Sequence, residues 1–259
     1  LPRMLTPAEV EHLNREGRGK LLVGSDRVIG VSVGGEHRAY PLRLMRWHEV
    51  VNDAVGGTPV AVTYSPPSDG VAVFDRRLGG ETLRLAVSGL LLDANLLMYD
   101  RRPEAGASSL FSQLRATAVA GPLAGRVLQV MPASVRRWDA WLDLHPGTRV
   151  MAPDPEHLPR YRRDPYHSYF GSDLLRFPAA PLPGPSGLAL KDRVVIVGPP
   201  GAERAVALRH LSAAPGGAAQ VEVEGRPVVV RAVLDPPTAW AGDETPLRLA
   251  CHFAWYATE

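Results

Sequence analysis

A short apolar pattern near the start of the chain recurs once, far downstream. Asp26-Arg27-Val28-Ile29-Gly30-Val31 is echoed by Asp192-Arg193-Val194-Val195-Ile196-Val197, an offset of 166 positions from residue 26 to residue 192. The same offset pairs Gly35 with Gly201, Arg38 with Arg204, Ala39 with Ala205, Leu42 with Leu208 and Arg43 with Arg209. Recurrence at one spacing is typical of a duplicated supersecondary unit. The alternative is a chance match, because unrelated hairpins also share glycine turns.

The recurrence predicts how the chain is divided. We expect two unequal pseudo-repeats over about residues 20–152 and 188–259, the second shorter and without counterparts of the helix around His48 and the loop around Ser65. Residues 1–152 would form the main β-rich domain, and 188–259 would pack on it. Residues 153–187, rich in Pro, Arg and Tyr, would be a linker or a long wrapping segment.

The many turn-forming residues restrict the fold class. The chain holds 25 prolines and 25 glycines, which favours short strands joined by turns over a helix bundle. We expect a mixed α+β, β-rich fold of antiparallel strands with short helices. The main expected elements are a hairpin over residues 27–40 that turns at Gly34-Gly35, a strand over 59–64, a hairpin over 71–87, a strand over 127–130 and a helix over 138–142.

Charge and hydropathy exclude some kinds of partner. The net charge of +2 is too small to predict a nucleic-acid partner. No run of residues approaches the ~20 apolar positions of a membrane-spanning helix. The single cysteine, Cys251, excludes an intramolecular disulfide and a multi-cysteine metal site.

A polar stretch that starts at Trp47 supplies the first candidate site. Leu42, Met45, Val50 and Val51 have roughly helical spacing, which predicts a helix that begins at Pro41 and is stopped by Gly56-Gly57. His48 would then share a helix face with Asn52, and Glu49 with Asp53. His48, with Glu49 and Asp53, could ligate a metal or act as a base, although Asn52 is a poor zinc ligand. The alternative is that His48 and Asp53 bond neighbouring backbone groups in a packed corner.

The second candidate site is a loop, Thr63-Tyr64-Ser65-Pro66-Pro67-Ser68-Asp69-Gly70. A nucleophilic Ser65 or Ser68 would need a base and an oxyanion pocket, and His48 could approach. The pattern Gly-x-Ser-x-Gly is absent, however. The alternative is a stiff turn whose serines bond the backbone.

A third candidate, for protein contacts, lies in the Pro/Arg/Tyr-rich segment. Arginine and tyrosine are frequent anchors of protein interfaces. The residues expected to contact a partner are Arg160, Tyr161, Arg162, Arg163, Tyr166 and Tyr169. The alternative is a wrapping segment in which the arginines stack on tyrosines and pair with acids such as Asp164.

Several ordered motifs resemble one bacterial family. They include Ala39-Tyr40-Pro41-Leu42, Trp47-His48-Glu49-Val50-Val51-Asn52-Asp53, Val73-Phe74-Asp75-Arg76, Leu97-Met98-Tyr99-Asp100-Arg101 and His145-Pro146-Gly147-Thr148. The chain resembles the family catalogued as domain of unknown function 3179, well over residues 25–170 and more loosely beyond. Members often look exported or lipid-anchored, so the resemblance implies a periplasmic or cell-surface location.

The same resemblance points to a lost site. Relatives typically read Cys-Pro-Leu-Cys-Gly where this chain reads Ser65-Pro66-Pro67-Ser68-Asp69. The chain is therefore expected to be a divergent member without the Cys-x-x-Cys of its family. Serine is neither a soft metal ligand nor a redox group, so thiol chemistry is not expected here.

Two functions remain open from the sequence. The favoured one is a non-catalytic binding or structural subunit outside the cytoplasm, with a protein partner or larger assembly, no cofactor and no nucleic acid. Any association with a membrane would then run through the partner. The alternative is a metal- or redox-type enzyme of unknown substrate that uses a pocket of His48, Asp53, Ser65 and Ser68.

Overall fold

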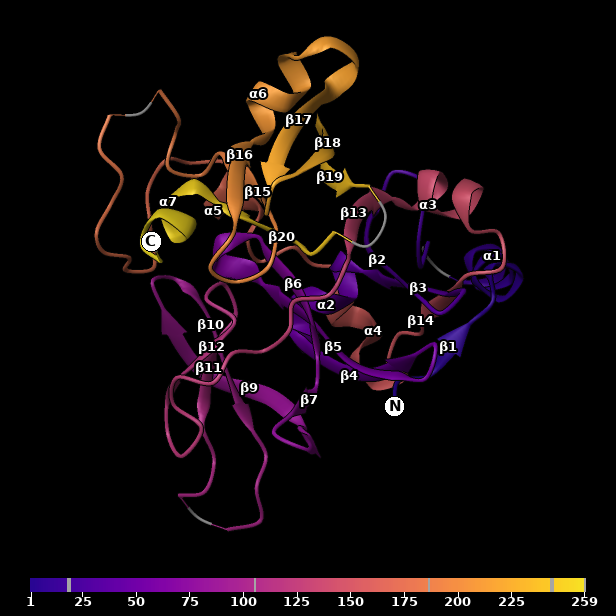
Figure 1. Cartoon of the computed structure of the whole chain (residues 1–259). Coiled ribbons are helices and arrows are strands. Elements are labelled where there is room, and N and C mark those ends of the chain that lie inside the picture. Colours follow the sequence, from indigo (N-terminus) through magenta and orange to yellow (C-terminus); the bar gives the residue numbers. More distant parts are fainter. Residues whose placement is uncertain (18–19, 105, 186, 243–244, 259) are drawn as a thin grey trace.

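Strands dominate the chain, and its helices are short. The computed structural model describes residues 1–17, 20–104, 106–185, 187–242 and 245–258, so parts of the expected ranges, such as residues 186 and 243–244, lie outside the described residues. Nearly all strand pairs in this part of the chain are antiparallel. The predicted class, mixed α+β and β-rich, is confirmed (Figure 1).

The first half begins with the predicted hairpin and continues through a helix into a three-stranded meander. Gly34 and Gly35 have φ of 56° and 77°, which their lack of a Cβ allows, and they turn the hairpin. The elements are α1 (Pro7–Glu16), β2 (Arg27–Val33), β3 (Glu36–Pro41), α2 (Leu42–His48), β4 (Val50–Val55), β5 (Thr58–Ser65) and β6 (Gly70–Asp75).

The second half repeats this order of elements. Its members are β15 (Arg193–Val197), β16 (Arg204–Ala207), α6 (Leu208–Ala213), β17 (Ala218–Val223), β18 (Arg226–Leu234) and β19 (Pro237–Ala241). A helix thus follows the hairpin as α2 does, and Pro236 lies between β18 and β19, with Pro237 as the first residue of β19. The expectation that residues 188–259 lack a counterpart of the helix around His48 does not hold in position, since α6 follows the same kind of hairpin, and the expectation for the loop around Ser65 stays a prediction. Duplication itself stays a prediction.

Two long sheets each take strands from both halves. The eight-stranded sheet has the order β1-β14-β3-β2-β13-β19-β18-β17, and the six-stranded sheet has the order β16-β15-β20-β6-β5-β4. The additional strands are β1 (Met4–Leu5), β13 (Ser134–Arg137), β14 (Arg149–Met151) and β20 (Leu247–Cys251). Only the pair β14–β3 in these sheets is parallel among the described residues. Residues 188–259 therefore do not pack on a finished first domain, because they complete its sheets.

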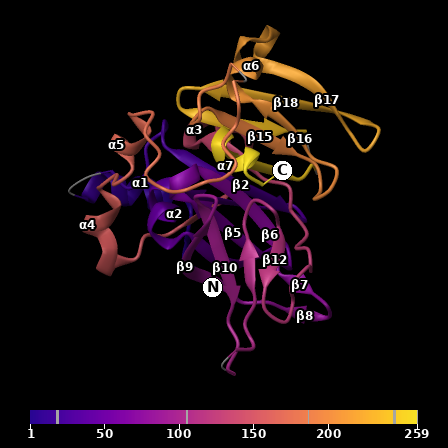
Figure 2. The same cartoon turned by 90° about the vertical axis from the view of Figure 1, so that its left-hand side faces the viewer.

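An insert separates β6 from β13 and forms two sheets of its own, a four-stranded one of the order β12-β11-β10-β9 and a two-stranded one of β7 and β8. It consists of β7 (Arg77–Leu78), β8 (Glu81–Thr82), β9 (Leu85–Leu92), β10 (Asn95–Asp100), β11 (Leu110–Ser112) and β12 (Thr117–Ala120). The insert projects away from the second half (Figure 2). The expected hairpin over residues 71–87 is wrong, since β6 pairs with β5 and β20 and only β7 and β8 turn at Gly79-Gly80. Residues 127–130 form isolated bridges in place of the expected strand.

Side chains from both long sheets form the largest apolar cluster, which includes Tyr40, Val62, Val195 and Leu249. A smaller cluster joins α1 to α3 (Trp138–Leu144), the helix expected over 138–142. Gly30 lies against the ring of Trp141, because a Cβ there would come within 2.2 Å of the indole. The last helix, α7 (His252–Tyr256), packs beside β20 in another cluster.

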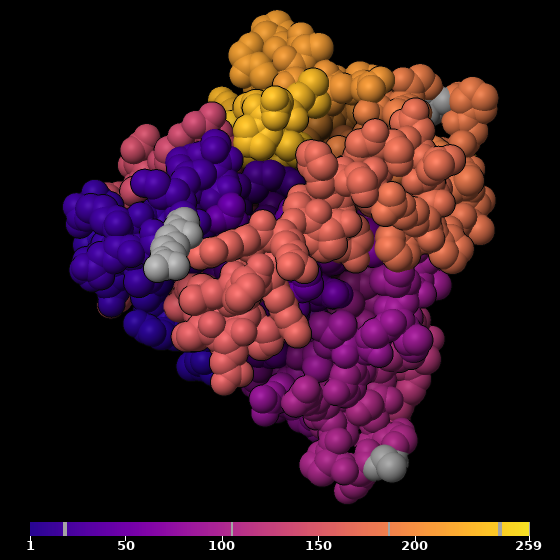
Figure 3. Space-filling view, turned by 180° about the vertical axis from the view of Figure 1, so that it is seen from behind, coloured from indigo at the N-terminus to yellow at the C-terminus, as the bar shows by residue number. Residues whose placement is uncertain are grey.

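Residues 153–187 wrap across one face of the molecule (Figure 3). They contain α4 (Leu158–Tyr161) and α5 (His167–Phe170) and little other regular structure. Phe170, Leu175 and Phe177 pack against the apolar cluster of the second half. Lys191 Nζ fixes the same stretch by donating to the carbonyls of Tyr169, Ser172 and Leu174 at 2.5, 2.5 and 2.8 Å. Residues 153–187 therefore form a segment that wraps on the core, and they are not a free linker.

Candidate functional site

The predicted helix through Asp53 is wrong, because α2 ends at His48. Glu49 has φ 55° and ψ −42°, a conformation that is strained for a residue with a Cβ. Its backbone turns the chain out of α2, and the Glu49 carbonyl accepts a hydrogen bond from the Tyr64 amide at 2.8 Å. β4 begins at the next residue, so His48 and Asn52 do not share a helix face.

His48 contacts the wrapping segment. Its Nε2 lies 2.7 Å from the hydroxyl of Tyr161. Burial lowers the pKa of His48, and the neighbouring His157 lowers it further, while Asp154 acts in the opposite direction. Asp154 is in turn paired with His157 Nδ1 at 2.9 Å. His48 is thus held by a tyrosine rather than placed as a base for a serine.

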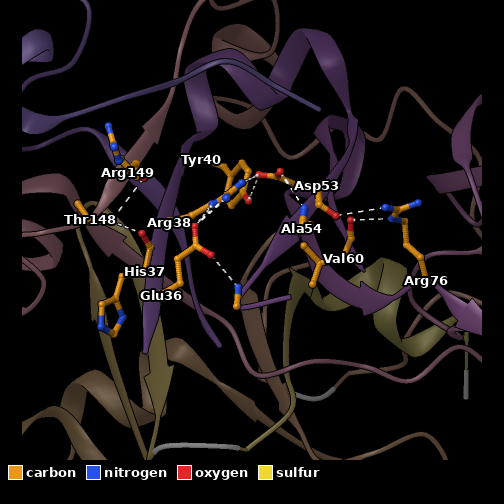
Figure 4. Close-up of polar contacts among 11 residues, drawn as sticks. Glu36, His37, Arg38, Tyr40, Asp53, Ala54, Val60, Arg76, Thr148 and Arg149 are labelled. Atoms are coloured by element: carbon orange, nitrogen blue, oxygen red, sulfur yellow. Dashed lines mark hydrogen bonds and ion pairs between the residues drawn. The ribbon is translucent and has the colours of Figure 1, made fainter. Parts of the chain in front are cut away.

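Asp53 is the centre of a separate buried network (Figure 4). Its carboxylate accepts from Tyr40 Oη at 2.7 Å and from the Ala54 amide at 2.8 Å, and pairs with Arg38 Nη1 at 2.5 Å. Burial disfavours the charged guanidinium, but hydrogen bonds to Asp53 and Glu36 outweigh burial and raise the pKa of Arg38. Burial and the Asp53 charge raise the pKa of Tyr40. These contacts join β3 to β4.

Ser65 and Ser68 lie in a neutral network that is closed to solvent. Both are 0% exposed. Ser65 Oγ accepts from the Leu96 amide at 3.0 Å, and Ser68 Oγ accepts from Asn95 Nδ2 at 2.9 Å. Asn95 Nδ2 also donates to Gln113 at 2.8 Å. We call Ser65, Ser68, Asn95 and Gln113 the amide–hydroxyl network. It joins the β5–β6 turn to the insert.

Asp69, the next residue of the turn, is the centre of a charged cluster that the sequence reasoning missed. It is 1% exposed and accepts from Tyr64 Oη at 2.8 Å, Arg27 Nη1 at 3.0 and 3.1 Å, and Arg193 Nε at 3.1 Å. Burial alone would raise the pKa of Asp69, but Arg27 and Arg193 outweigh it and lower it to about 2. We call Asp69, Tyr64, Arg27 and Arg193 the Asp69 cluster. The one feature of the sequence that pointed to the Asp69 cluster is that Arg27 and Arg193 occupy matching positions in the recurrent pattern.

Cys251 lies close to this cluster and is fully buried. Burial raises the pKa of its thiol to about 12, although Arg193 acts in the opposite direction. A thiol with so high a pKa is a poor nucleophile at neutral pH.

The proposed pocket of four residues does not form. β4 pairs with β5 so that Asp53 is opposite Val60, whereas Ser65 is five residues farther along β5, about 16 Å away at the rise of a strand. His48, Asp53 and the two serines each have their own partners. Within the described ranges, no three His, Cys, Asp or Glu side chains gather as metal ligands would.

A comparison with family models gives one match. The model for proteins of unknown function, DUF3179, matches residues 2–245. The chain belongs to the DUF3179 family. No curated protein and no solved structure matches it.

The partner-binding candidates of this DUF3179 protein divide by exposure. Tyr161 and Tyr169 are 5% and 0% exposed and hold the wrapping segment to the core, so they cannot be surface anchors. Arg160, Arg162 and Arg163 are exposed, and Tyr166 is half-buried. Half-buried Glu49 lines a cavity of about 390 Å³ beside Tyr166, and burial raises the pKa of its carboxyl group.

None of the described helices of this DUF3179 protein is both long and apolar enough to span a bilayer.

Proposed function

We propose that this DUF3179 protein is a non-catalytic binding subunit that works outside the cytoplasm and contacts a protein partner through residues 153–187. The observation that carries the proposal is the contrast within that segment. Its tyrosines anchor it, while Arg160, Arg162 and Arg163 are exposed on the outside.

An anchored segment is a favourable place for interface arginines. Lys191 donates to three carbonyl oxygens between residues 169 and 174, and Tyr161 is tied to His48. The backbone that carries the arginines is therefore ordered before any partner arrives, which reduces the entropy lost on binding. Arginine is also among the residues that contribute most at interfaces.

The hydrogen bonds of the former candidate site support a non-catalytic role. Ser65 and Ser68 are closed to solvent and engaged with Leu96 and Asn95. A nucleophile needs access to its substrate and a base within hydrogen-bond reach, and the candidate base His48 is bonded to Tyr161. The location outside the cytoplasm is proposed from the family resemblance alone, and any contact with a membrane would run through the partner.

The test is purification from the native organism after mild cross-linking. The variant Arg160→Ala/Arg162→Ala/Arg163→Ala should lose a partner that the wild type retains. A matched control removes the same charge from exposed arginines elsewhere, Arg101→Ala/Arg226→Ala/Arg231→Ala, and should retain the partner. Equal recovery of the partner by both variants would contradict the assignment to residues 153–187.

Elemental analysis of the native protein tests the non-catalytic part separately. A metal bound at one equivalent per chain would overturn it. Fractionation of the native cells tests the location, since recovery of the protein with cytoplasmic markers would exclude a periplasmic or cell-surface site.

A further inference from the structure

A cavity of about 290 Å³ lies where the start of β2, α2 and the wrapping segment meet. Five arginines and two aspartates contribute to its lining: Arg27, Arg43, Arg46, Arg162, Arg163, Asp26 and Asp164. The lining therefore has three positive charges in excess. Because the molecule as a whole carries only +2, this local excess is not a consequence of overall composition.

The two aspartates are committed to two of the arginines. Asp164 pairs with Arg46 at 3.0 Å, and Asp26 lies 4.0 Å from Arg43. Both carboxylates also accept from backbone amides, of Tyr166 and Val23 respectively, at 2.9 Å. They therefore fix these two arginines in place, Arg27 pairs with Asp69, and the remaining cations of the cavity have no counter-charge among the described residues.

Arg162 and Arg163 are those remaining cations at the rim. Both are exposed, and within the described part of the chain neither side chain has a hydrogen bond or an ion pair. They follow α4, whose Tyr161 is buried, so the backbone that places them at the cavity is fixed.

The inner wall adds to the positive potential. Arg27 lines the cavity and shares the single carboxylate of Asp69 with Arg193. Its Nε and Nη2, and Nε of Arg46, are buried and have no hydrogen-bond partner among the residues that the structure describes. Two guanidinium groups on one carboxylate leave a net positive charge in a place of low dielectric, where the field on a nearby ligand is strong.

We propose that this cavity binds the phosphoryl group of a small phosphate ester. A phosphate monoester carries about −1.5 to −2 charges at neutral pH, which matches the excess better than the single charge of a carboxylate. Guanidinium groups also fit phosphate oxygens with paired N–H donors. The volume is near the lower limit of small-molecule sites, which favours a compact ligand. This inference does not depend on the proposed protein partner.

Isothermal titration of the purified full-length protein with glycerol 3-phosphate and with inorganic phosphate, at low ionic strength, tests the proposal. We expect saturable binding of one equivalent. Arg162→Ala/Arg163→Ala should weaken it by about tenfold or more, because the two unpaired rim cations are lost. The matched control Arg226→Ala/Arg231→Ala removes the same charge from exposed positions of β18 and should bind as the wild type does.

Vesicle flotation separates a soluble ester from a lipid headgroup. Vesicles of phosphatidylcholine with phosphatidic acid should carry the protein only if the cavity reaches a membrane-bound phosphate, and either source supports a phosphoryl site. Absence of saturable binding in both assays would overturn the proposal. An equal loss of binding in the two double variants would also overturn it, since the effect would then come from general charge.

Discussion

The two sides of the Ser65–Asp69 turn are built from opposite kinds of polar contact. On one side, the amide–hydroxyl network joins the turn to the insert through neutral groups. On the other, the Asp69 cluster joins it to β2 and β15, one strand from each half of the chain, through charges. The neutral side is buried, and on the charged side Asp69 and Tyr64 are buried while Arg27 and Arg193 are half-buried.

The difference lies in what each side needs in order to stay intact. Neutral hydrogen bonds are satisfied at any moderate pH, and the loss of one partner leaves a few unpaired polar atoms. A buried ion pair fails more severely, because removing one partner leaves uncompensated charge. The charged side should therefore control the stability of the whole molecule, and the neutral side only the attachment of the insert.

The largest expected effect comes from removing the negative charge. Asp69→Asn keeps the shape but leaves Arg27 and Arg193 without a counter-charge, so we expect a loss of about 4 kcal/mol in the free energy of unfolding. Urea denaturation measures it. Asp139→Asn, which breaks the exposed pair with Arg137, is the control and should change stability by less than about 1 kcal/mol. Equal losses in the two variants would contradict the comparison.

A substitution in the amide–hydroxyl network should lower the free energy of unfolding by less. Asn95→Ala removes the donor to Ser68 and Gln113 and the acceptor of the Leu114 amide at 3.2 Å. We expect a loss of about 2.5 kcal/mol, from unsatisfied polar atoms and a small void. Hydrogen exchange should locate this change mainly in the insert. Exchange that accelerates equally in β2 and β15 would show that the two sides are not distinct.

Acid should act on the charged side alone. The folded-state pKa of Asp69, about 2, lies below its unfolded value of about 3.9, so its stabilisation is complete above pH ~4 and is lost as the pH falls towards 2. The expected loss is about 2 kcal/mol. Denaturation of wild type and Asp69→Asn at several pH values measures it, because other carboxylates titrate in both proteins. Parallel pH profiles would exclude this role for Asp69.

The smallest effect is expected at Ser65, which the sequence offers as a candidate nucleophile. Ser65→Ala removes only the acceptor of the Leu96 amide, and we expect a loss of about 1 kcal/mol that does not vary between pH 4 and pH 8. Chemical denaturation across this range measures it. A pH-dependent loss would indicate that the Ser65 hydroxyl is coupled to an ionisable group.

Local patterns in the sequence predicted much of the fold. The glycine pair at 34–35 and the apolar residues around it identified the first hairpin, and the tryptophans of 138–141 identified α3. The helix predicted from apolar spacing ends early, at His48, because residues 50–55 fit the period of a helix and also the two-residue period of a strand. Their alternation buries Val51, Asp53 and Val55, and the buried aspartate concealed a strand pattern.

The site was harder to predict than the elements. The serines and His48 were identified by chemical type, but their partners come from distant segments: Asn95 and Leu96 for the serines, and Tyr161 for His48. Asp69 was passed over because its arginines are 42 and 124 residues away. Such contacts depend on how the sheets combine, which local patterns do not encode.

The shared sheets affect how the chain can be made. While residues up to about 187 emerge during synthesis, β13 and β6 each lack one neighbour, because β19 and β20 are still to come. Those open edges can pair with other chains, so a truncated or stalled product should aggregate rather than persist as a stable fragment. Residues 188–259 thus complete both long sheets in the final stage of folding. We expect that stage to be slow, because it pairs strands that are far apart in the sequence.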